Sequence, residues 1–273
     1  CIDNEIKIVQ TLLKSKSIST ETLHATSYGN HATILNLAIH CITPYSTALH
    51  VVCLKGHTQL VEDLLNEPEA LVLWNAQDIN NDTALALAIR EGHLDVVQTM
   101  LLYATSQLDK LALTQEKDVH NELYSIPTTA LMRAVEENHL QIVQVLLRYK
   151  YAHFDIDVNL EDDDGNIALH LAIEENNLEI VEELLSHASI DVNRVSNVSM
   201  QSPLMWAIRN DSADILHCLL EREELDFSVD GEHPLYYAAK HGFVESVRAL
   251  LECSRVNDTN VENAFGFTSL GTA

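Results

Sequence analysis

A short phrase with leucine at its third position recurs along the chain and sets the hydrophobic pattern. Its successive copies begin 31 to 46 residues apart. After each of the first six copies, Val or Leu follows at fourteen residues from the start, and Leu-Leu or Met-Leu follows at seventeen and eighteen. The copies are Thr47–His50, Thr83–Ala86, Thr129–Met132, Ile167–His170, Ser202–Met205, His233–Tyr236 and Thr268–Gly271. Internal repetition of this length predicts an array of stacked structural repeats.

Each repeat is predicted to contain two short helices. The first helix opens at the phrase and has a small residue five places after the start, which is Ala in five of the six copies. The second helix carries its Val and Leu-Leu residues three and four positions apart, so they share one face. Between the helices, steps such as Gly56-His57 and Gly92-His93 break the first helix and turn the chain. Neither helix can bury its apolar face within one repeat, so neighbouring repeats must stack.

These residues resemble the ankyrin repeat, whose pattern is D-x-x-G-x-T-P-L-H-x-A, then G-H, then I-V-x-x-L-L. Segment 162–185 matches it best, through Gly165, Ala168-Leu169-His170, Ala172, Ile180-Val181 and Leu184-Leu185. The resemblance covers nearly the whole chain, and the combined motif favours ankyrin over another helical-hairpin array such as HEAT or TPR. It implies an all-α fold, an ankyrin-repeat solenoid of helix–turn–helix units with short hairpin-like turns between repeats.

The register also predicts the domain boundaries. We expect one or more partial repeats with a degenerate helix in 1–46, six ankyrin repeats in 47–267, and the start of a further repeat in 268–273. The six repeats are 47–82, 83–128, 129–166, 167–201, 202–232 and 233–267. Segment 33–38 is interpreted as a degenerate repeat, with a helical insertion as the alternative. Repeat 83–128 holds about ten extra residues, which predict an extended or added short helix. Both ends fall inside a repeat, so we interpret the chain as part of a longer protein.

Charge and cysteine usage narrow the choice of partner and compartment. The formal net charge is −25, from 41 acidic and 16 basic residues. Phosphate backbones would be repelled, so we expect no nucleic acid and instead a partner protein with a basic surface. The sequence predicts no membrane span. Five scattered cysteines predict free thiols in a reducing compartment. We therefore expect a cytoplasmic monomer, located in the host cytosol if the chain is a secreted effector.

The sequence offers little evidence of a metal-binding or catalytic site. The 14 histidines mostly fall at repeat positions and show no zinc-ligand spacing. Asp155-x-Asp157-x-Asn159 begins like a calcium loop, but Leu160 and Asn166 stand where that loop needs Gly and Glu. Cys53 and Cys218 lie in helical registers, where a buried small residue is the usual role. No nucleotide or hydrolase motif is present, so we predict no cofactor and no enzyme.

The resemblance places partner binding on the turn tips and on the concave face of the first helices. Positions seven and eight after each start, together with the acidic turn before segment 167–201, supply the candidate residues. They are Arg90, Glu91, Glu136, Glu137, Asp163, Asp164, Glu174, Glu175, Arg209 and Lys240. The acidic middle of this set predicts a concave negative patch that binds a basic segment of the partner. The alternative is that these charges only solvate exposed helices.

The sequence thus predicts a protein–protein interaction scaffold. The alternative is the recognition module of a larger multidomain enzyme or of a secreted bacterial effector acting on host proteins, with the catalytic part outside this chain. One modification is also considered. Leu185, followed after five residues by Asp191-Val192-Asn193, resembles the ankyrin pattern that asparaginyl hydroxylases modify on Asn. We favour the interpretation that Asn193 simply builds the turn between repeats.

Overall fold

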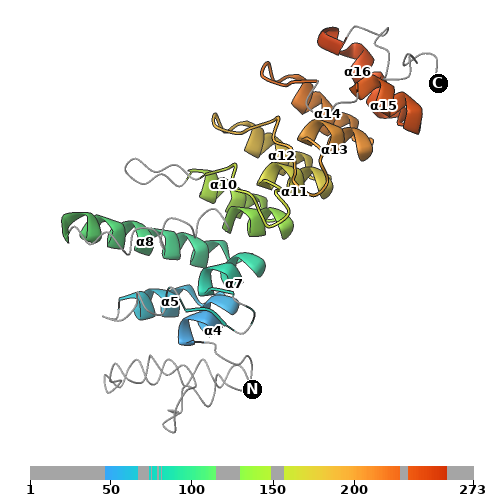
Figure 1. Ribbon diagram of the computed structural model, residues 1–273. Helices are drawn as coiled ribbons and strands as arrows, with labels where there is room; N and C mark the ends of the chain where they lie inside the picture. The colour runs from blue at the N-terminus through green and yellow to red at the C-terminus, as the bar shows by residue number, and fades with distance from the viewer. Residues whose placement is uncertain are drawn as a thin grey trace. The chain divides into compact units, whose positions relative to one another are not determined.

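The computed structural model describes residues 47–66, 74, 76–78, 80, 82–114, 130–148, 157–227 and 233–256, without the side chains of 106–114. The predicted segments 1–46 and 268–273 lie outside the described residues. Helices dominate the described part, in which we find no β-strand and one isolated bridge between Gln77 and Thr83 (Figure 1). The helices are α4 Ala48–Leu54, α5 Thr58–Leu65, α7 Ala84–Arg90, α8 Leu94–Thr114, α10 Leu140–Arg148, α11 Ala168–Glu174, α12 Leu178–Leu185, α13 Pro203–Arg209, α14 Ala213–Leu220, α15 Pro234–His241, α16 Val244–Glu252 and the short η1 Ser254–Val256. Residues 130–136 are helical as well.

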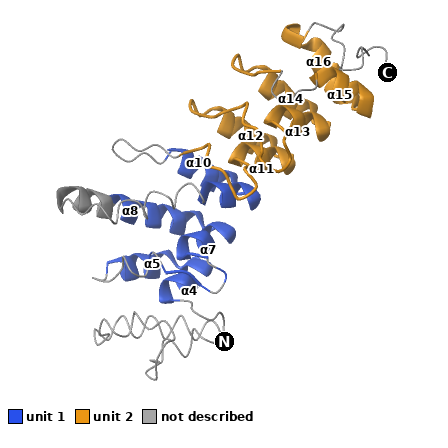
Figure 2. Cartoon of the chain, in the orientation of Figure 1, with its two compact units in different colours: residues 1–154 blue, residues 155–273 orange. Residues whose placement is uncertain are grey.

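The chain divides into two compact units, residues 1–154 and 155–273 (Figure 2). In unit 1, α4 packs on α5 and α7, and α8 packs on α5, α7 and α10. In unit 2, the first helices α11, α13 and α15 pack in sequence, and the second helices α12, α14 and α16 do the same. Each unit is therefore a stack of helical hairpins, and the predicted all-α fold of paired helices is confirmed.

The first helices begin where the recurring phrase begins. Thr47, Thr83 and Ser202 act as N-caps whose side-chain oxygens accept a hydrogen bond from the backbone N–H three residues later. Capping satisfies an amide that the helix itself leaves unpaired. Ile167 has no side-chain acceptor, and its own backbone N–H donates to Nδ1 of His170 at 3.1 Å. The start of the helix is thus fixed by short-range hydrogen bonds even where the Thr is lost.

The core consists of the positions that the register singles out. The phrase leucines are at most 3% exposed, and the small residues five places after each start are fully buried. These leucines are Leu49, Leu85, Leu131, Leu169, Leu204 and Leu235.

The paired apolar residues of the second helices are also buried, except at Leu251, which is 52% exposed where the equivalent Leu220 is 8% exposed. The prediction that Leu251 shares the buried face is wrong, because no helical hairpin follows α16 among the described residues to cover it. Covering this leucine with the next repeat therefore stabilises the stack by about 2 kcal/mol through the hydrophobic effect.

The extra residues of repeat 83–128 lengthen a helix. Helix α8 has 21 residues, whereas the other second helices have 8 or 9. Of the two predicted outcomes for the insertion, the structure shows the extended helix. Residues 115–129, which complete the insertion, lie outside the described part of the chain.

Glycine and histidine of neighbouring repeats pack against each other in unit 1. Gly92 adopts φ +73°, and a Cβ placed there would lie 2.8 Å from the ring of His139. His139 in turn donates from Nε2 to the Arg90 carbonyl oxygen at 3.2 Å. Gly56 and His93 repeat this arrangement, with His93 donating to the carbonyl of Leu54. The imidazoles of His93 and His139 thus connect their own repeats to the preceding ones through hydrogen bonds to backbone carbonyl groups.

Candidate partner-binding surface

The basic residue Arg90 is half-buried and forms an ion pair within unit 1. Its Nη1 lies 2.8 Å from Oδ2 of Asp82, whose side chain is only 11% exposed. Arg133, on the next first helix, reaches the same carboxylate at 3.4 Å. The Asp82 carbonyl oxygen also accepts a hydrogen bond from Nε2 of His50 at 3.1 Å. Asp82 therefore joins three successive repeats, and the position of Arg90 has a structural explanation.

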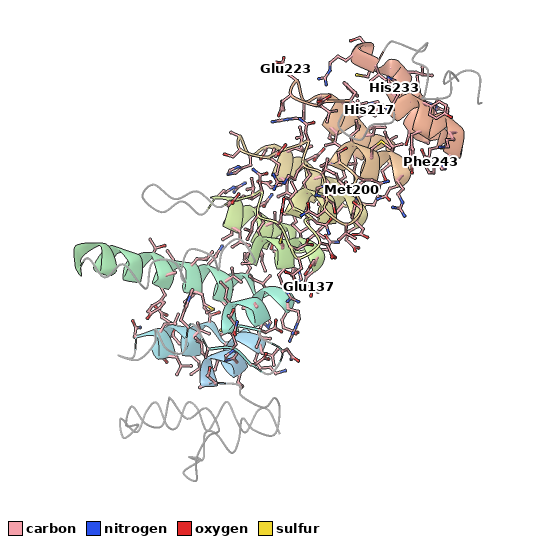
Figure 3. The ribbon with its side chains drawn as sticks, viewed as in Figure 1. Glu137, Met200, His217, Glu223, His233 and Phe243 are labelled. Atoms are coloured by element: carbon pink, nitrogen blue, oxygen red, sulfur yellow. The ribbon has the colours of Figure 1, made fainter. Side chains whose placement is uncertain are left out.

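The two acidic pairs lie at the C-terminal ends of first helices. Glu174 is the last residue of α11, Glu175 is its C-cap, and both are exposed. In unit 1, Glu136 ends the helical residues 130–136 and is exposed, while Glu137 is half-buried beside it (Figure 3). Glu136 lies 3.9 Å from Arg133. The pairs belong to different units, so each is considered within its own unit.

The remaining predicted residues are also at the surface. Glu91 caps the C-terminus of α7, and its carboxylate lies 3.5 Å from Nε of Arg90. Arg209 ends α13 and is exposed, and Lys240 lies in the last turn of α15 over the ring of Tyr236. Basic residues at helix C-termini interact favourably with the helix dipole. The stability of the helices alone therefore accounts for Arg209 and Lys240.

The turn tips of unit 2 stack through backbone contacts. In the turn 162–166, the Asp162 carboxylate accepts hydrogen bonds from the backbone N–H groups of Asp164 and Asn166, so its charge is used inside the turn. Asp163 and Asp164 point their own carboxylates to solvent and are exposed. The Asp164 carbonyl oxygen accepts from Val198 N–H at 3.1 Å, which sets the next turn beside this one.

Asn193 connects its repeat to the following one. Its side-chain amide donates to the Glu224 carbonyl oxygen at 2.8 Å, and its side-chain oxygen accepts from the N–H of Asp226 at 2.8 Å. Asn159 makes the same pair of bonds to Ser189 and Asp191, 2.6 and 2.8 Å long. This repetition supports the turn-building interpretation of Asp-Val-Asn. Hydroxylation of Asn193 stays a prediction, to be checked by intact mass spectrometry after treatment with an asparaginyl hydroxylase.

The turn 196–201 is one residue longer than the turns before it. Ser196 N–H donates to the carbonyl of Gln201, five residues on, whereas Asp162 N–H donates to Asn166, four residues on. Beneath this turn His170 is fully buried, and its Nε2 has no hydrogen-bond partner, unlike Nε2 of His50. Burial lowers the pKa of His170 to about 4, although the carbonyl groups of Arg194 and Gln201 oppose this shift. The imidazole is thus neutral at physiological pH.

Two exposed apolar residues of this turn were not among the sequence candidates. Val198 and Met200 are 69% and 68% exposed. Figure 3 labels Met200. The only sequence signal for them is that Met200 stands where three other copies of the pattern have a turn glycine, at Gly165, Gly231 and Gly266. Their exposure depends on the local path of the longer turn, which the repeat pattern does not encode.

The described residues offer little for catalysis or metal binding. Within them, no group of three or more His, Cys, Asp or Glu side chains is arranged to hold a metal ion. Cys53 is buried as expected, and burial raises the pKa of its thiol. Cys218 is only half-buried, because position 218 lies off the apolar face of α14 that Leu216, Leu219 and Leu220 form, and burial also raises its pKa. A thiol with a raised pKa is a poor nucleophile.

A comparison with known families decides the classification. A family model described as ankyrin repeats (3 copies) matches residues 1–112, 105–196 and 191–263. The chain belongs to the ankyrin repeat family. Ankyrin repeats are protein–protein interaction modules.

Similar proteins support the fold. The crystal structure of the ankyrin repeat domain of Bcl-3 matches with a TM-score of 0.65 and 22% sequence identity, over 83% of this chain and 93% of that chain. Alpha-latroinsectotoxin-Lt1a from Latrodectus tredecimguttatus is 37% identical over 90 residues, which are 33% of this chain and 6% of the toxin. The ankyrin chain thus matches a small part of that relative's length. None of the described helices of the ankyrin chain is both long and apolar enough to cross a membrane.

Proposed function

We propose that this ankyrin repeat chain is a scaffold that binds a basic surface of a partner protein through the acidic ends of its first helices. The net charge of −25 supports a basic partner, because charge complementarity accelerates encounter and selects among partners. The same charge opposes binding of nucleic acid. No cofactor or catalytic role is needed in this function.

The placement of the two glutamate pairs carries the proposal. A helix C-terminus bears partial negative charge, so a carboxylate there is unfavourable, by about 0.3–1 kcal/mol each. Helix α11 has no basic residue in its last turn, and its end carries both Glu174 and Glu175. Glu136 and Glu137 occupy the same place in unit 1. The ion pair with Arg133 gives Glu136 a role in folding. Folding alone does not account for Glu174 and Glu175 at the end of α11, whereas a basic partner does.

The test measures binding of peptides selected from a random library. A phage-displayed library of random 12-residue peptides is selected against the whole chain, and the affinity of the most enriched peptide is measured by fluorescence anisotropy at low and high salt. We expect enrichment of Lys and Arg. We also expect Glu174→Lys/Glu175→Lys, and separately Glu136→Lys/Glu137→Lys, to weaken binding about tenfold and to flatten its salt dependence.

A matched control has the same change of charge elsewhere. Glu179 and Glu182 are exposed on the second helix α12, so Glu179→Lys/Glu182→Lys alters net charge equally without touching a first-helix end. This control should leave affinity within about twofold of the original. Equal weakening by both kinds of variant would mean that only net charge matters, and the proposed site would be wrong.

A second candidate is that these repeats are the recognition part of a longer protein, either a multidomain enzyme or a secreted effector. It is favoured by the toxin relative, in which the matched segment is 6% of the length. Measuring the mass of the native protein by immunoblot tests this. A band near 30.5 kDa would contradict it.

We further propose that the chain acts as a monomer in a reducing, cytoplasmic compartment. The three described cysteines, Cys53, Cys218 and Cys253, are free thiols, which supports a reducing environment. Light scattering after size exclusion should give the mass of one chain, and a dimer mass would contradict the proposal.

A further inference from the structure

Val198 and Met200 form an exposed apolar pair on one turn. Both side chains are more than two-thirds exposed, and they lie two residues apart in the turn 196–201. A single exposed apolar side chain is common on protein surfaces, whereas neighbouring exposed apolar side chains mark a binding site more often. Nothing in the described stack requires either side chain for packing.

The backbone at Met200 is unusual for its residue type. Met200 has φ +55°, in the left-handed region. The other described residues with positive φ are Gly, Asn or Asp, the types that tolerate this region: Gly56, Gly92, Asn138, Gly165, Asn176, Asp211 and Gly242. Methionine at this position is therefore a poor choice for folding, and strain of this kind points to a role of the side chain in function.

The turn is firmly held although its side chains are exposed. Met200 N–H donates to the Ser196 carbonyl oxygen at 3.0 Å, and Val198 N–H donates to that of Asp164 at 3.1 Å. On the other side, Nε1 of Trp206 donates to Oγ of Ser199 at 3.1 Å. The backbone that carries the pair is thus held in place, so little backbone entropy is lost on binding.

Exposed carboxylates lie next to this apolar pair. The hydrogen bond from Val198 to the Asp164 carbonyl places the two turns side by side, and Asp163 and Asp164 are both exposed. Among the described residues no ion pair to either carboxylate is observed. We call Asp163, Asp164, Val198 and Met200 the tip surface. It offers apolar contact beside negative charge.

We propose that the tip surface anchors a short segment of the partner protein in which a large apolar side chain stands next to Lys or Arg. The apolar side chain packs on Val198 and Met200, and the basic group lies against Asp163 and Asp164. This inference rests on the proposed function, since it concerns the same basic partner. It adds an apolar anchor, which the glutamate pairs cannot provide.

The test replaces the apolar pair without disturbing the turn. In the variant Val198→Thr/Met200→Asn, Thr keeps the shape of Val, and Asn accepts the left-handed backbone better than Met does. We therefore expect the thermal midpoint of the variant to stay the same or rise. A role in folding predicts the opposite change, so the midpoint separates the two explanations.

Binding is measured with the peptides selected from the random 12-residue library. We expect the enriched peptides to carry Leu, Met or Phe next to Lys or Arg, and the variant to bind the most enriched one at least tenfold more weakly. Leu102→Asn on α8 is the matched control, because Leu102 is 72% exposed and lies in unit 1, and it should not change the affinity. Asp163→Lys/Asp164→Lys should weaken binding as well.

The results separate this inference from the proposed function. If the enriched peptide loses affinity with Glu174→Lys/Glu175→Lys but not with the tip variant, the helix-end site stands and the tip surface is wrong. If only the tip variants weaken binding, the tip surface stands without the helix-end site. Enrichment of no peptide, or of peptides lacking an apolar residue next to a basic one, would overturn the tip surface.

Discussion

The carboxylate of Asp82 and the guanidinium of Arg90 form an ion pair 2.8 Å long across the boundary that the register places between residues 82 and 83. Arg133 adds a second contact, so one buried carboxylate is shared by two partly exposed arginines. Either arginine can keep Asp82 paired when the other is removed.

We expect Arg90→Gln or Arg133→Gln alone to lower the free energy of unfolding by about 1 kcal/mol or less, because the arginines are partly screened by solvent. The double variant should lose more than the sum of the two, since it leaves Asp82 unpaired in a buried position. Urea unfolding at neutral pH measures this. Arg209→Gln, at an exposed position, is the control and should change little. Additive effects would show that Asp82 does not couple the arginines.

The asparagines Asn159 and Asn193 are expected to hold repeats together. Each Asn→Ala substitution removes one donated and one accepted hydrogen bond to the next repeat and should destabilise unit 2 by about 1–3 kcal/mol. Hydrogen exchange should speed up at the amides of Asp191 and Asp226, respectively. Unchanged exchange at these amides would argue against the connection. Asn→Asp, which keeps the acceptor and loses the donor, should give a smaller effect.

Acid should destabilise unit 2 through His170. The pKa of His170 is about 4 in the fold and near 6.5 when unfolded, so the unfolded chain binds a proton first as the pH falls. The contribution of His170 to the free energy of unfolding is fully present above about pH 6.5. It is lost progressively as the pH falls to about 4, by about 3 kcal/mol in total. Burial also lowers the pKa of His50, which acts in the same direction in unit 1.

Urea unfolding between pH 4 and 7 measures this dependence. His170→Gln should flatten the decrease in stability, whatever its effect at neutral pH. His217→Gln is the control, because the side chain of His217 is 48% exposed. If the slopes of His170→Gln and the original chain coincide, His170 is not the group responsible.

Two glycines at the same position of different repeats separate backbone strain from steric conflict. Gly92 and Gly242 have φ +73° and +76°, but only Gly92 has a neighbour, His139, in the space that a Cβ would fill. Gly242→Ala should cost about 1 kcal/mol from left-handed strain alone. Gly92→Ala should cost clearly more and break the bond from His139 to Arg90. Equal losses in thermal unfolding would show that the ring of His139 moves aside freely.

The sequence predicts the helices and their buried faces well, because each is set by periodic apolar residues within one repeat. Leu49 and Leu184 are fully buried, as their register predicts. It predicts side-chain partners poorly, since these come from other repeats. Nothing near Arg90 in the sequence indicates that it shares Asp82 with Arg133, 51 residues beyond that carboxylate.

The candidate surface was predicted only in part, for a similar reason. The surface positions of Glu174 and Glu175 follow from their place at the end of a first helix. The exposure of Val198 and Met200 depends on one additional residue in their turn. A pattern of apolar and polar positions does not indicate the left-handed backbone of Met200. Turn geometry, rather than helix register, limits what the sequence tells about binding.

The packing of histidine on glycine between repeats also bears on how such an array can evolve. His139 lies over Gly92, whereas at the equivalent position of repeat 167–201 the left-handed residue is Asn176, and Ser212 donates to its side chain instead. The matched pair thus spans two repeats and belongs to neither. A recombination event that duplicates, deletes or exchanges a whole repeat keeps each helical hairpin intact but can place an imidazole over a residue that has a side chain. The interface between two neighbouring repeats, rather than the single repeat, is then the unit whose residues must be inherited together.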